Sequence, residues 1–401
     1  MSKTEIPSIR FHGFDDAWEQ RKVSDLLVER NEQAPMSDEY PLMAFIANEG
    51  VAPKGERYDR SSLVNDTAGK LYKKTEFGDF IYSSNNLETG SIGLNKYGNA
   101  CISPVYSIFQ PTGLADSDFI GRRFVRKDFI NAMVKWRQGV IYGQWKIHES
   151  DFLKIEVSVP SVEEQRKIGA FLDHLDDLIT LHQRKFEKLT NVKKSMLEKM
   201  FPKDGADVPE VRFKGFTGAW KRKRFSELYE SVIQKNDLTY GVDKNITVAS
   251  MQYRPDIKVT DIEYLRTYNV LKLGDIAFEG HQSKEFRYGR FVENDIGDGI
   301  VSHIFAVFRP KTDYDLMFWK YAINNERIMR PVLVRCTKAS TMMNDLVSKD
   351  FLEESILVPD IEEQKKIGTV LSEIDRLISL QQEELKKLQS FKKALLEKMF
   401  V

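Results

Sequence analysis

The sequence predicts an α+β fold in which two globular domains are joined by two long helices that pair as a coiled coil. Three observations lead to this prediction. The chain has 401 residues, and a single hydrophobic core stops growing at about 250 to 300 residues. The second half of the chain repeats the first, and each copy ends in a long segment of helical periodicity without proline. We therefore expect an internal pseudo-two-fold symmetry that follows from the duplication.

Three pairs of matching segments anchor the repeat. They are RFHGFDDAW at 10–18 with RFKGFTGAW at 212–220, VPSVEEQRKIG at 159–169 with VPDIEEQKKIG at 358–368, and the ending LEKMF at 197–201 and again at 396–400. A period of about 200 residues is far longer than the 20 to 45 residues of a solenoid repeat. The chain is therefore a duplicated module, in which a variable block is followed by a helix.

Each helix has a defined start, because a proline that ends a strand is followed by the spacing of a capping box. The start signals are Pro160, Ser161 and Glu164 in the first copy and Pro359, Asp360 and Glu363 in the second. About 39 residues without proline follow, enough for one helix of about 58 Å in each copy.

Apolar residues in both helices recur in steps of four and three, a period of about 3.5 residues that is typical of a coiled-coil seam. The seam residues are Ile168, Leu172, Leu175, Ile179, Phe186 and Leu189 in the first copy and Ile367, Leu371, Ile374, Ile378, Leu385 and Leu388 in the second. The polar interruptions fall at matching steps, with His182 and Lys193 in the first copy and Gln381 and Lys392 in the second. Fixing the helix register is one role for such residues. The alternative is an amphipathic helix that lies on its own domain.

The variable blocks alternate short β-rich runs with Gly, Asn and Asp turns and then become helical, which predicts an α+β domain of about 150 residues in each half. The expected boundaries are 1–158 for the first domain, 159–201 for the first helical region, 202–357 for the second domain and 358–401 for the second helical region.

Charge and cysteine content exclude several classes of protein. The 60 Lys and Arg residues balance 60 Asp and Glu residues, so the chain lacks the basic excess common in proteins that bind DNA alone. Cys101 and Cys336 are far apart in the sequence, so free buried thiols are expected instead of a disulfide or a zinc site. The start lacks the apolar run of a signal peptide, and no segment approaches the roughly 18 apolar residues of a membrane span. We expect a cytoplasmic protein without membrane contact.

The sequence resembles the specificity subunit of type I restriction-modification systems. The resemblance covers nearly the whole chain. It is carried by the RFxGFxxAW openings, the Gly-Asp pairs at Gly78 and Gly274, the segment SPVYSIF at 103–109 and above all the paired VPxxEEQxKI…LEKMF helices. It implies two α/β target recognition domains, each reading one half of a split site in double-stranded DNA. It also implies that the helices pair antiparallel and hold methyltransferase subunits, two in number, through which restriction subunits join.

The sequence motifs give little support for an enzymatic function. Residues 50–56 hold the two glycines of a phosphate loop, but Glu56 stands where a lysine must reach the phosphates. The letters of a PD-ExK nuclease occur at Pro359, Asp360, Glu363 and Lys365, but all within one capped helical turn. The six histidines show no metal-binding spacing, and no glycine-rich loop for S-adenosylmethionine is present. We therefore expect a non-catalytic subunit without cofactor or metal.

Residues that read bases are expected in two loops of each domain, because side chains with paired donors and acceptors must be held in register in the major groove. In the first domain they are Ser83, Asn85, Asn86 and Lys96, then Arg137, Gln138, Tyr142 and Gln144. In the second they are His281, Gln282, Lys284, Arg287 and Tyr288, then Lys338, Ser340, Thr341 and Asn344. For each one, a surface polar residue that touches no DNA is the alternative.

An antiparallel helix pair would present the two domains to one face of the duplex about one turn apart, roughly 34 to 36 Å or 10 base pairs. With half-sites of about 3 to 5 base pairs, the unread spacer is expected to be about 5 to 8 base pairs. Two other functions remain open: a coiled-coil scaffold whose two heads bind proteins, and an orphan or decoy specificity subunit that serves methylation only.

Overall fold

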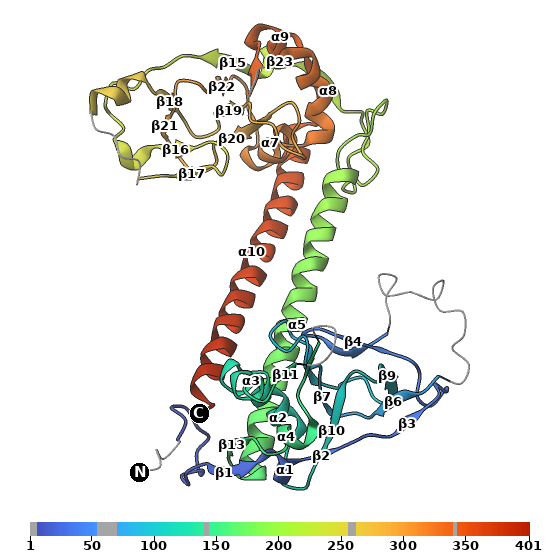
Figure 1. The fold of residues 1–401 in the computed structure, drawn as a ribbon. Helices are drawn as coiled ribbons and strands as arrows, with labels where there is room; N and C mark the ends of the chain where they lie inside the picture. Colours follow the sequence, from blue (N-terminus) through green and yellow to red (C-terminus); the bar gives the residue numbers. More distant parts are fainter. Residues whose placement is uncertain (1–5, 54–69, 140–143, 256–261, 340–342) are drawn as a thin grey trace. The chain divides into compact units, whose positions relative to one another are not determined.

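The structure, a computed structural model, describes residues 6–53, 70–139, 144–255, 262–339 and 343–401. The chain forms two compact units, one of Met1–His182 with Glu384–Val401 and the other of Gln183–Glu383. Each unit contains one α+β domain, part of the long helix that follows this domain and part of the long helix of the other half (Figure 1). Both unit boundaries therefore fall inside the long helices.

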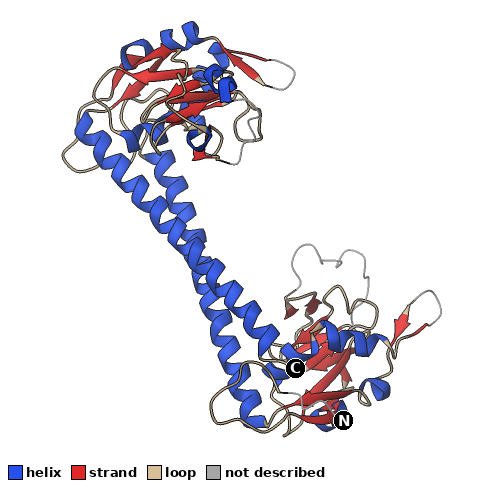
Figure 2. Ribbon diagram, turned by 90° about the vertical axis from the view of Figure 1, so that its left-hand side faces the viewer, coloured by secondary structure: helices blue, strands red, loops and turns tan. Residues whose placement is uncertain are grey.

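The first unit is built from short antiparallel strands with helices beside them (Figure 2). Its elements are β1 (Glu19–Lys22), α1 (Val23–Leu26), β2 (Leu27–Glu29), β3 (Gln33–Ala34), β4 (Ala44–Ile46), β5 (Gly50–Ala52), β6 (Tyr72–Thr75), β7 (Phe80–Tyr82), β8 (Ile92–Leu94), β9 (Ala100–Ile102), β10 (Ser107–Pro111), α2 (Ser117–Phe124), α3 (Lys127–Val134), β11 (Gln138–Gly139), β12 (Trp145–Lys146), α4 (Glu149–Phe152), β13 (Glu156–Val159) and the first part of α5 (Val162–Lys199). Its main sheet has the order β2-β10-β7-β8, and a second sheet has the order β3-β6-β9. The strand pairs β1–β13, β4–β5 and β11–β12 complete it.

The second unit repeats this topology. Its elements are β14 (Lys221–Arg224), α6 (Phe225–Leu228), β15 (Tyr229–Val232), β16 (Ile246–Thr247), β17 (Gln252–Tyr253), β18 (Asn269–Leu271), β19 (Ile276–Glu279), β20 (Arg290–Glu293), β21 (Gly299–Val301), β22 (Val307–Pro310), α7 (Leu316–Ile323), α8 (Glu326–Cys336), β23 (Thr337–Ala339), β24 (Asn344–Leu346), α9 (Ser348–Glu353), β25 (Ser355–Val358) and the first part of α10 (Ile361–Lys398), with two short 3₁₀ helices at Val242–Lys244 and Ile262–Thr267. The main sheet β15-β22-β19-β20 matches β2-β10-β7-β8. The strand pairs β14–β25 and β23–β24 match β1–β13 and β11–β12. The duplication predicted from the sequence is therefore a duplication of fold.

Helices α5 and α10 each run unbroken for 38 residues, as their periodicity predicted. They pair antiparallel within each unit. In the first unit Lys392 of α10 forms an ion pair with Asp176 of α5, and residues later in α10 pack against residues earlier in α5. In the second unit Lys193 of α5 lies 2.6 Å from a carboxylate oxygen of Asp375 of α10. The predicted pairing of the two conserved helices is confirmed.

The VPxxEEQxKIG motif attaches each domain to its helix. Glu164, with a fully buried side chain, binds Arg10 through two hydrogen bonds of 2.7 and 2.8 Å. The side-chain oxygen of Gln165 accepts a 2.9 Å hydrogen bond from the backbone N–H of Asp116, the N-cap of α2. A Cβ on Gly169 would lie 2.8 Å from Oδ1 of Asp116, so glycine permits this close approach. The same contacts recur in the second unit with Glu363, Arg212, Gln364, Asp315 and Gly368.

The predicted capping box forms only in part. Ser161 accepts a 3.3 Å hydrogen bond from the backbone N–H of Glu164, and Asp360 accepts one of 2.9 Å from Glu363. In a complete capping box the glutamate side chain would also accept a hydrogen bond from the backbone N–H of the N-cap residue. This part of the prediction is wrong, because each glutamate instead binds the arginine of the RFxGFxxAW motif. A buried carboxylate is stabilised more by a paired guanidinium than by one backbone N–H.

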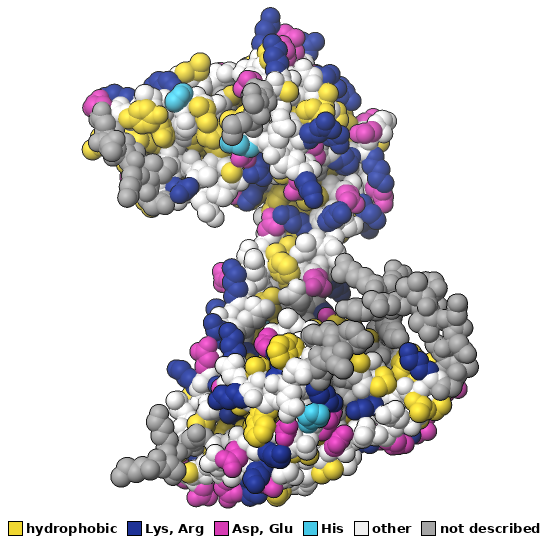
Figure 3. Space-filling view, in the orientation of Figure 1, with side chains coloured by type: hydrophobic (Ala, Val, Ile, Leu, Met, Phe, Trp, Pro, Cys, Tyr) yellow, Lys and Arg dark blue, Asp and Glu magenta, His cyan; other side chains and the backbone are white. Residues whose placement is uncertain are grey.

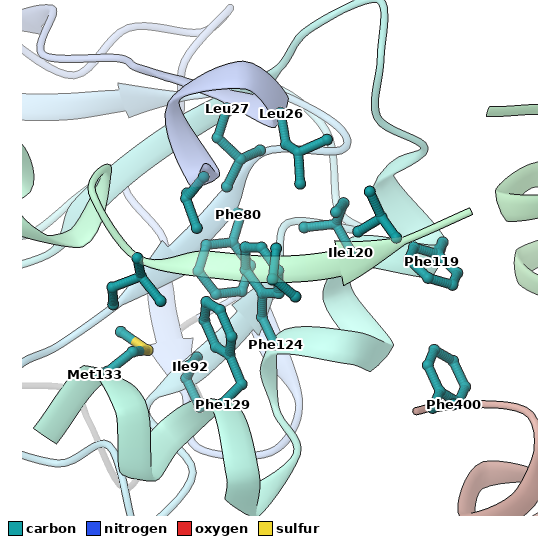
Figure 4. Close-up of a cluster of buried hydrophobic side chains, with 14 of the residues drawn as sticks. Leu26, Leu27, Phe80, Ile92, Phe119, Ile120, Phe124, Phe129, Met133 and Phe400 are labelled. Carbon is teal, nitrogen blue, oxygen red and sulfur yellow. The ribbon is translucent and has the colours of Figure 1, made fainter. Parts of the chain in front are cut away.

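The core of the first unit is closed by the end of the other repeat. Phe400, which follows α10, is 4% exposed and lies in the same buried cluster as Phe119 (Figure 4). Trp18 belongs to the same cluster. The Phe400 ring stacks on Phe119 at 5.4 Å and meets Trp18 edge-on at 6.4 Å. Arg126 of this domain donates a hydrogen bond to the carbonyl of Leu396 near the end of α10, where a cation also complements the helix dipole.

The second unit closes its core in the same way. Phe201, which follows α5, is 1% exposed and packs against Trp220 at 5.9 Å and Phe318 at 5.7 Å. The Arg327 guanidinium donates to the carbonyls of Phe201 and Pro202. Each α+β domain therefore completes its core with the LEKMF ending of the other half.

Both cysteines are free and buried, as predicted, and burial raises the pKa of the Cys336 thiol to about 12. Among the helices that the structure describes, none is long and apolar enough to cross a membrane.

Candidate nucleic-acid interface

The two loops predicted from the sequence lie next to each other in the first domain. The first follows β7, and the second is the β11–β12 hairpin. Ser84 Oγ accepts a 2.9 Å hydrogen bond from the backbone N–H of Ile147, and Asn85 Oδ1 accepts one of 2.6 Å from Trp145. The loops thus form one surface, although about 60 residues separate them in the chain.

The second domain brings its two loops together at the same place, after β19 and at the β23–β24 hairpin. The backbone N–H of Asn344 donates to the carbonyl of Gly280 at 2.8 Å. The side chain of Asn344 donates to the carbonyl of Arg287 at 3.0 Å and accepts a hydrogen bond from Gln282 at 3.4 Å. Asn344 is 4% exposed, so it organises the surface from beneath.

Seven of the eight residues predicted in the first domain fall into three groups. Exposed on the loop surface are Asn85, Asn86, Gln138 and Gln144. Ser83 is buried, and Arg137 is held by Glu88 through two hydrogen bonds of 2.8 Å. Tyr142 lies outside the described residues.

Lys96 is placed apart from the other predicted residues. Its ammonium lies 2.9 Å from Asp118 and 2.7 Å from Asp173 of α5. Burial opposes the charge, but hydrogen bonds to both carboxylates outweigh it and raise the pKa of Lys96. Lys96 lines a groove of about 720 Å³ beside α5 that also holds six carboxylates, a setting that disfavours a DNA phosphate.

Most of the second domain's predicted residues are exposed on its loop surface. They are His281, Gln282, Lys284, Arg287 and Lys338. Tyr288 is half-buried, and the centre of its ring lies 5.9 Å from the Arg287 guanidinium and 6.0 Å from that of Arg330. Ser340 and Thr341 lie outside the described residues.

Two residues of these surfaces escaped the sequence analysis. Trp145, which is 48% exposed, stands on the β11–β12 hairpin beside Arg137. Arg330 is exposed on α8 and reaches the loop surface through Tyr288. A tryptophan directly after the predicted Gln144 was a visible signal for the first. Arg330 carried no local signal, because only the packing of α8 against the loop brings it there.

The two loop surfaces differ in charge. In the first, Arg137 is paired with Glu88, and Lys146 with Glu149 at 2.7 Å. In the second, four cations are exposed on the loops and α8, namely Lys284, Arg287, Arg330 and Lys338, against two exposed carboxylates, Glu285 and Asp345. Elsewhere on the face drawn in Figure 3, Lys and Arg side chains are mixed with Asp and Glu over both units. The positive charge suited to phosphate contacts therefore lies mainly on the second domain.

None of the twelve seam residues is exposed. Ile168, Leu172 and Leu175 lie in the core of the first unit, and Ile367 and Leu371 in that of the second. Other apolar residues of the helices face outward: Leu181 and Phe391 in the first unit are 46% and 51% exposed, and Leu380 in the second is 42% exposed. The helices therefore keep apolar surface that their own packing does not cover.

Side chains of the types that bind metal ions do not gather into a metal site among the residues that the structure describes. No group of three or more His, Cys, Asp or Glu side chains there could hold a metal ion. Glu363, one of the letters of the nuclease pattern, is 1% exposed and bound to Arg212, so it has a structural role. Residues 54–56 of the possible phosphate loop lie outside the described residues.

Fold and surfaces together define a two-headed recognition protein, with one pair of loops on each of two duplicated domains. Comparisons with known proteins agree. The sequence model of the "Type I restriction modification DNA specificity domain" matches twice, at residues 16–191 and 219–390. The chain is 22% identical to the type I restriction enzyme MjaVIII specificity subunit of Methanocaldococcus jannaschii, over 94% of this chain and 91% of that protein.

A solved structure shows the same fold. The type I restriction-modification S subunit from M. genitalium superposes with a TM-score of 0.59 at 13% identity, over 99% of both chains. Since the family model covers most of the sequence, the chain belongs to the type I restriction-modification DNA specificity family. It is a DNA sequence-specificity subunit, and these findings do not favour the protein scaffold or the orphan subunit.

Proposed function

We propose that each α+β domain reads one half of a split DNA site through its paired loops, and that the helices set the unread spacer between the halves. This proposal rests on one observation: within each domain, two loops far apart in the sequence lie side by side and form one surface. A loop pair anchored on a sheet holds side chains in the register that base reading requires. In the first domain the readers are Asn85, Asn86, Gln138 and Gln144, with Trp145 beside them.

In the second domain the readers are His281, Gln282, Lys284, Arg287 and Lys338, with Tyr288 and Arg330 beside them. Arg is suited to guanine, and Asn and Gln are suited to adenine. The first surface offers mainly Asn and Gln, whereas the second adds Lys, Arg and His to its single Gln, so the two half-sites should differ in sequence.

The helices serve as the platform for partner proteins. The outward-facing Leu181, Leu380 and Phe391 give apolar surface of the kind that protein interfaces use. We infer that two methyltransferase subunits dock on the helices and that restriction subunits join through them. The chain itself is non-catalytic in this proposal, since the buried carboxylates of Glu164, Glu363 and Asp275 are bound to arginines and have structural roles.

Methylome sequencing of the host tests the proposal. A wild-type strain should show one split adenine-methylated motif that disappears when the gene is deleted. Gln282→Ala should change the base preference of one half-site, and Gln138→Ala that of the other. Lys154→Met, which breaks the exposed ion pair with Asp151 outside the two loop segments, is the control and should leave the motif intact. Loss of both half-sites from one loop substitution would contradict independent reading.

A further inference from the structure

A three-residue relay links the first domain to both long helices. Arg122, on α2, lies 2.8 Å from Asp176 of α5 and 2.6 Å from Asp173 one turn earlier. Asp176 also receives Lys392 from α10. One aspartate therefore joins the domain, its own helix and the helix of the other repeat. The Arg122 side chain is only 14% exposed, while its partners Asp173 and Asp176 are 32% and 36% exposed, so solvent screens these contacts in part.

The second unit has a corresponding relay of different chemistry. Tyr321, on α7, donates a 2.7 Å hydrogen bond to Asp375 of α10, and Asp375 receives Lys193 from α5 at 2.6 Å. The Lys193 ammonium also lies 5.4 Å from the centre of the Tyr321 ring. Burial and the neighbouring Asp375 raise the pKa of Tyr321, so its hydroxyl remains a donor at neutral pH.

The two relays occupy equivalent positions of the duplicated fold. Arg122 and Tyr321 stand at the same place of α2 and α7, counted from the capping aspartates of these helices. Lys193 and Lys392 are the matching polar steps of the two seams. The duplication has thus kept the aspartate and the lysine of the relay while the domain's own residue changed from a guanidinium to a phenol.

Each relay adds a directional contact to an attachment that already rests on apolar packing. Gln165 and Gly169 hold the N-terminal end of α2 against α5, and Phe119 in its first turn stacks on Phe400. Arg122 stands in the last turn of α2 and binds this end to α5 by charge. Apolar packing is non-directional, whereas hydrogen-bonded ion pairs have a specific geometry. Half-buried ion pairs add little net stability compared with apolar packing, and fixing one arrangement is their best-attested use.

We propose that these relays are positioning devices that hold each recognition domain at a fixed angle on the helix pair and thereby make the protein strict about spacer length. The proposal rests on the split-site function proposed above. A domain that swings on its helix would move its loops along the duplex, where one base pair is a step of about 3.4 Å. Loss of a relay should therefore widen the range of accepted spacers without changing the bases read.

Tyr321→Phe is the cleanest test, because it keeps the buried ring and removes only the hydroxyl. Arg122→Met removes the first relay and keeps most of the aliphatic stem. Arg122→Lys, which restores a cation, should rescue the first relay in part. Control substitutions at ion pairs remote from the helices are Arg266→Met, which breaks the 2.6 Å pair with Glu263, and Lys154→Met.

The variants are assayed as complexes with the methyltransferase, on DNA that carries both half-sites with spacers from three base pairs shorter to three longer than the natural one. We expect the preference for the natural spacer over one that differs by one base pair to fall about fivefold in Tyr321→Phe and Arg122→Met, but not in the controls. An unchanged preference in both variants, whether overall methylation stays normal or falls equally at all spacers, overturns the proposal. A wild-type complex that shows no split site would instead refute the proposed function itself.

Discussion

Replacing Phe400 by alanine should destabilise the first unit, whose core it closes from the end of the second repeat. The ring is 4% exposed and touches Phe119, Trp18 and the Arg126 guanidinium. The substitution removes this ring from a packed cluster and leaves a cavity between the domain and the end of α10.

The expected cost is about 3 to 5 kcal/mol. A phenylalanine buries roughly 150 to 250 Å², which at about 25 cal/mol per Å² corresponds to about 4 to 6 kcal/mol when the reference chain is fully extended. A more compact unfolded chain lowers this figure, and measured Phe→Ala substitutions in cores cost about 3 to 5 kcal/mol.

Hydrogen exchange followed by mass spectrometry locates the effect. Phe400→Ala should speed exchange in the β7, β10 and α2 peptides of the first unit, while the β19, β22 and α7 peptides stay protected. Phe201→Ala should give the reverse pattern. Phe391→Ala is the matched control, because its ring lies nine positions earlier in the same repeat and is 51% exposed. We expect it to change stability by less than about 0.5 kcal/mol.

Faster exchange in the second unit of Phe400→Ala, or no change in either unit, would refute the conclusion that the LEKMF ending of one half completes the core of the other. A loss of stability in Phe400→Ala no larger than that in Phe391→Ala would refute the same conclusion.

Three further predictions concern buried charge and DNA affinity. Burial raises the pKa of Glu293 well above its usual value, so the folded chain keeps a proton that the unfolded chain releases. The free energy of unfolding therefore falls as pH rises above about 4.3, the usual pKa of a glutamate in an unfolded chain. The gain in melting temperature from Glu293→Gln should be near zero at pH 4 and grow toward pH 7. Arg10→Met leaves the buried Glu164 carboxylate unpaired and should cost about 3 to 5 kcal/mol in denaturant unfolding, a value below 1 kcal/mol being incompatible with this view. The isolated chain should bind DNA weakly, with an affinity that depends little on salt concentration. The double variant Arg330→Ala and Lys338→Ala should lower the slope of log K against log salt by about 1 to 2. An unchanged slope would show that these cations do not face phosphate.

Local patterns in the sequence determined the modules of this protein. The period of about 3.5 residues and the absence of proline predicted two helices of nearly the observed length, because periodicity is a property of neighbouring residues. Pro160 and Pro359 predicted where the preceding strands end, since proline cannot continue a strand ladder. The places of the loops in the sequence could be predicted as well, because one follows the Gly-Asp strand and the other precedes the last strand in both halves; that they read bases stays a prediction.

Only the tertiary structure decided what the conserved residues contact. The sequence showed that both halves end in LEKMF but not that Phe201 and Phe400 enter the domain of the other half. Likewise the sequence showed that Lys193 and Lys392 interrupt the apolar seam, but not that they pair with Asp375 and Asp176. Lys96 is equally instructive, since its place after a strand suggested a loop, yet its two carboxylate partners lie on α2 and α5. Contacts between residues so far apart in the chain leave no local period or spacing, so they exist only once each domain packs on its helix and the antiparallel helices bring the two halves of the sequence together.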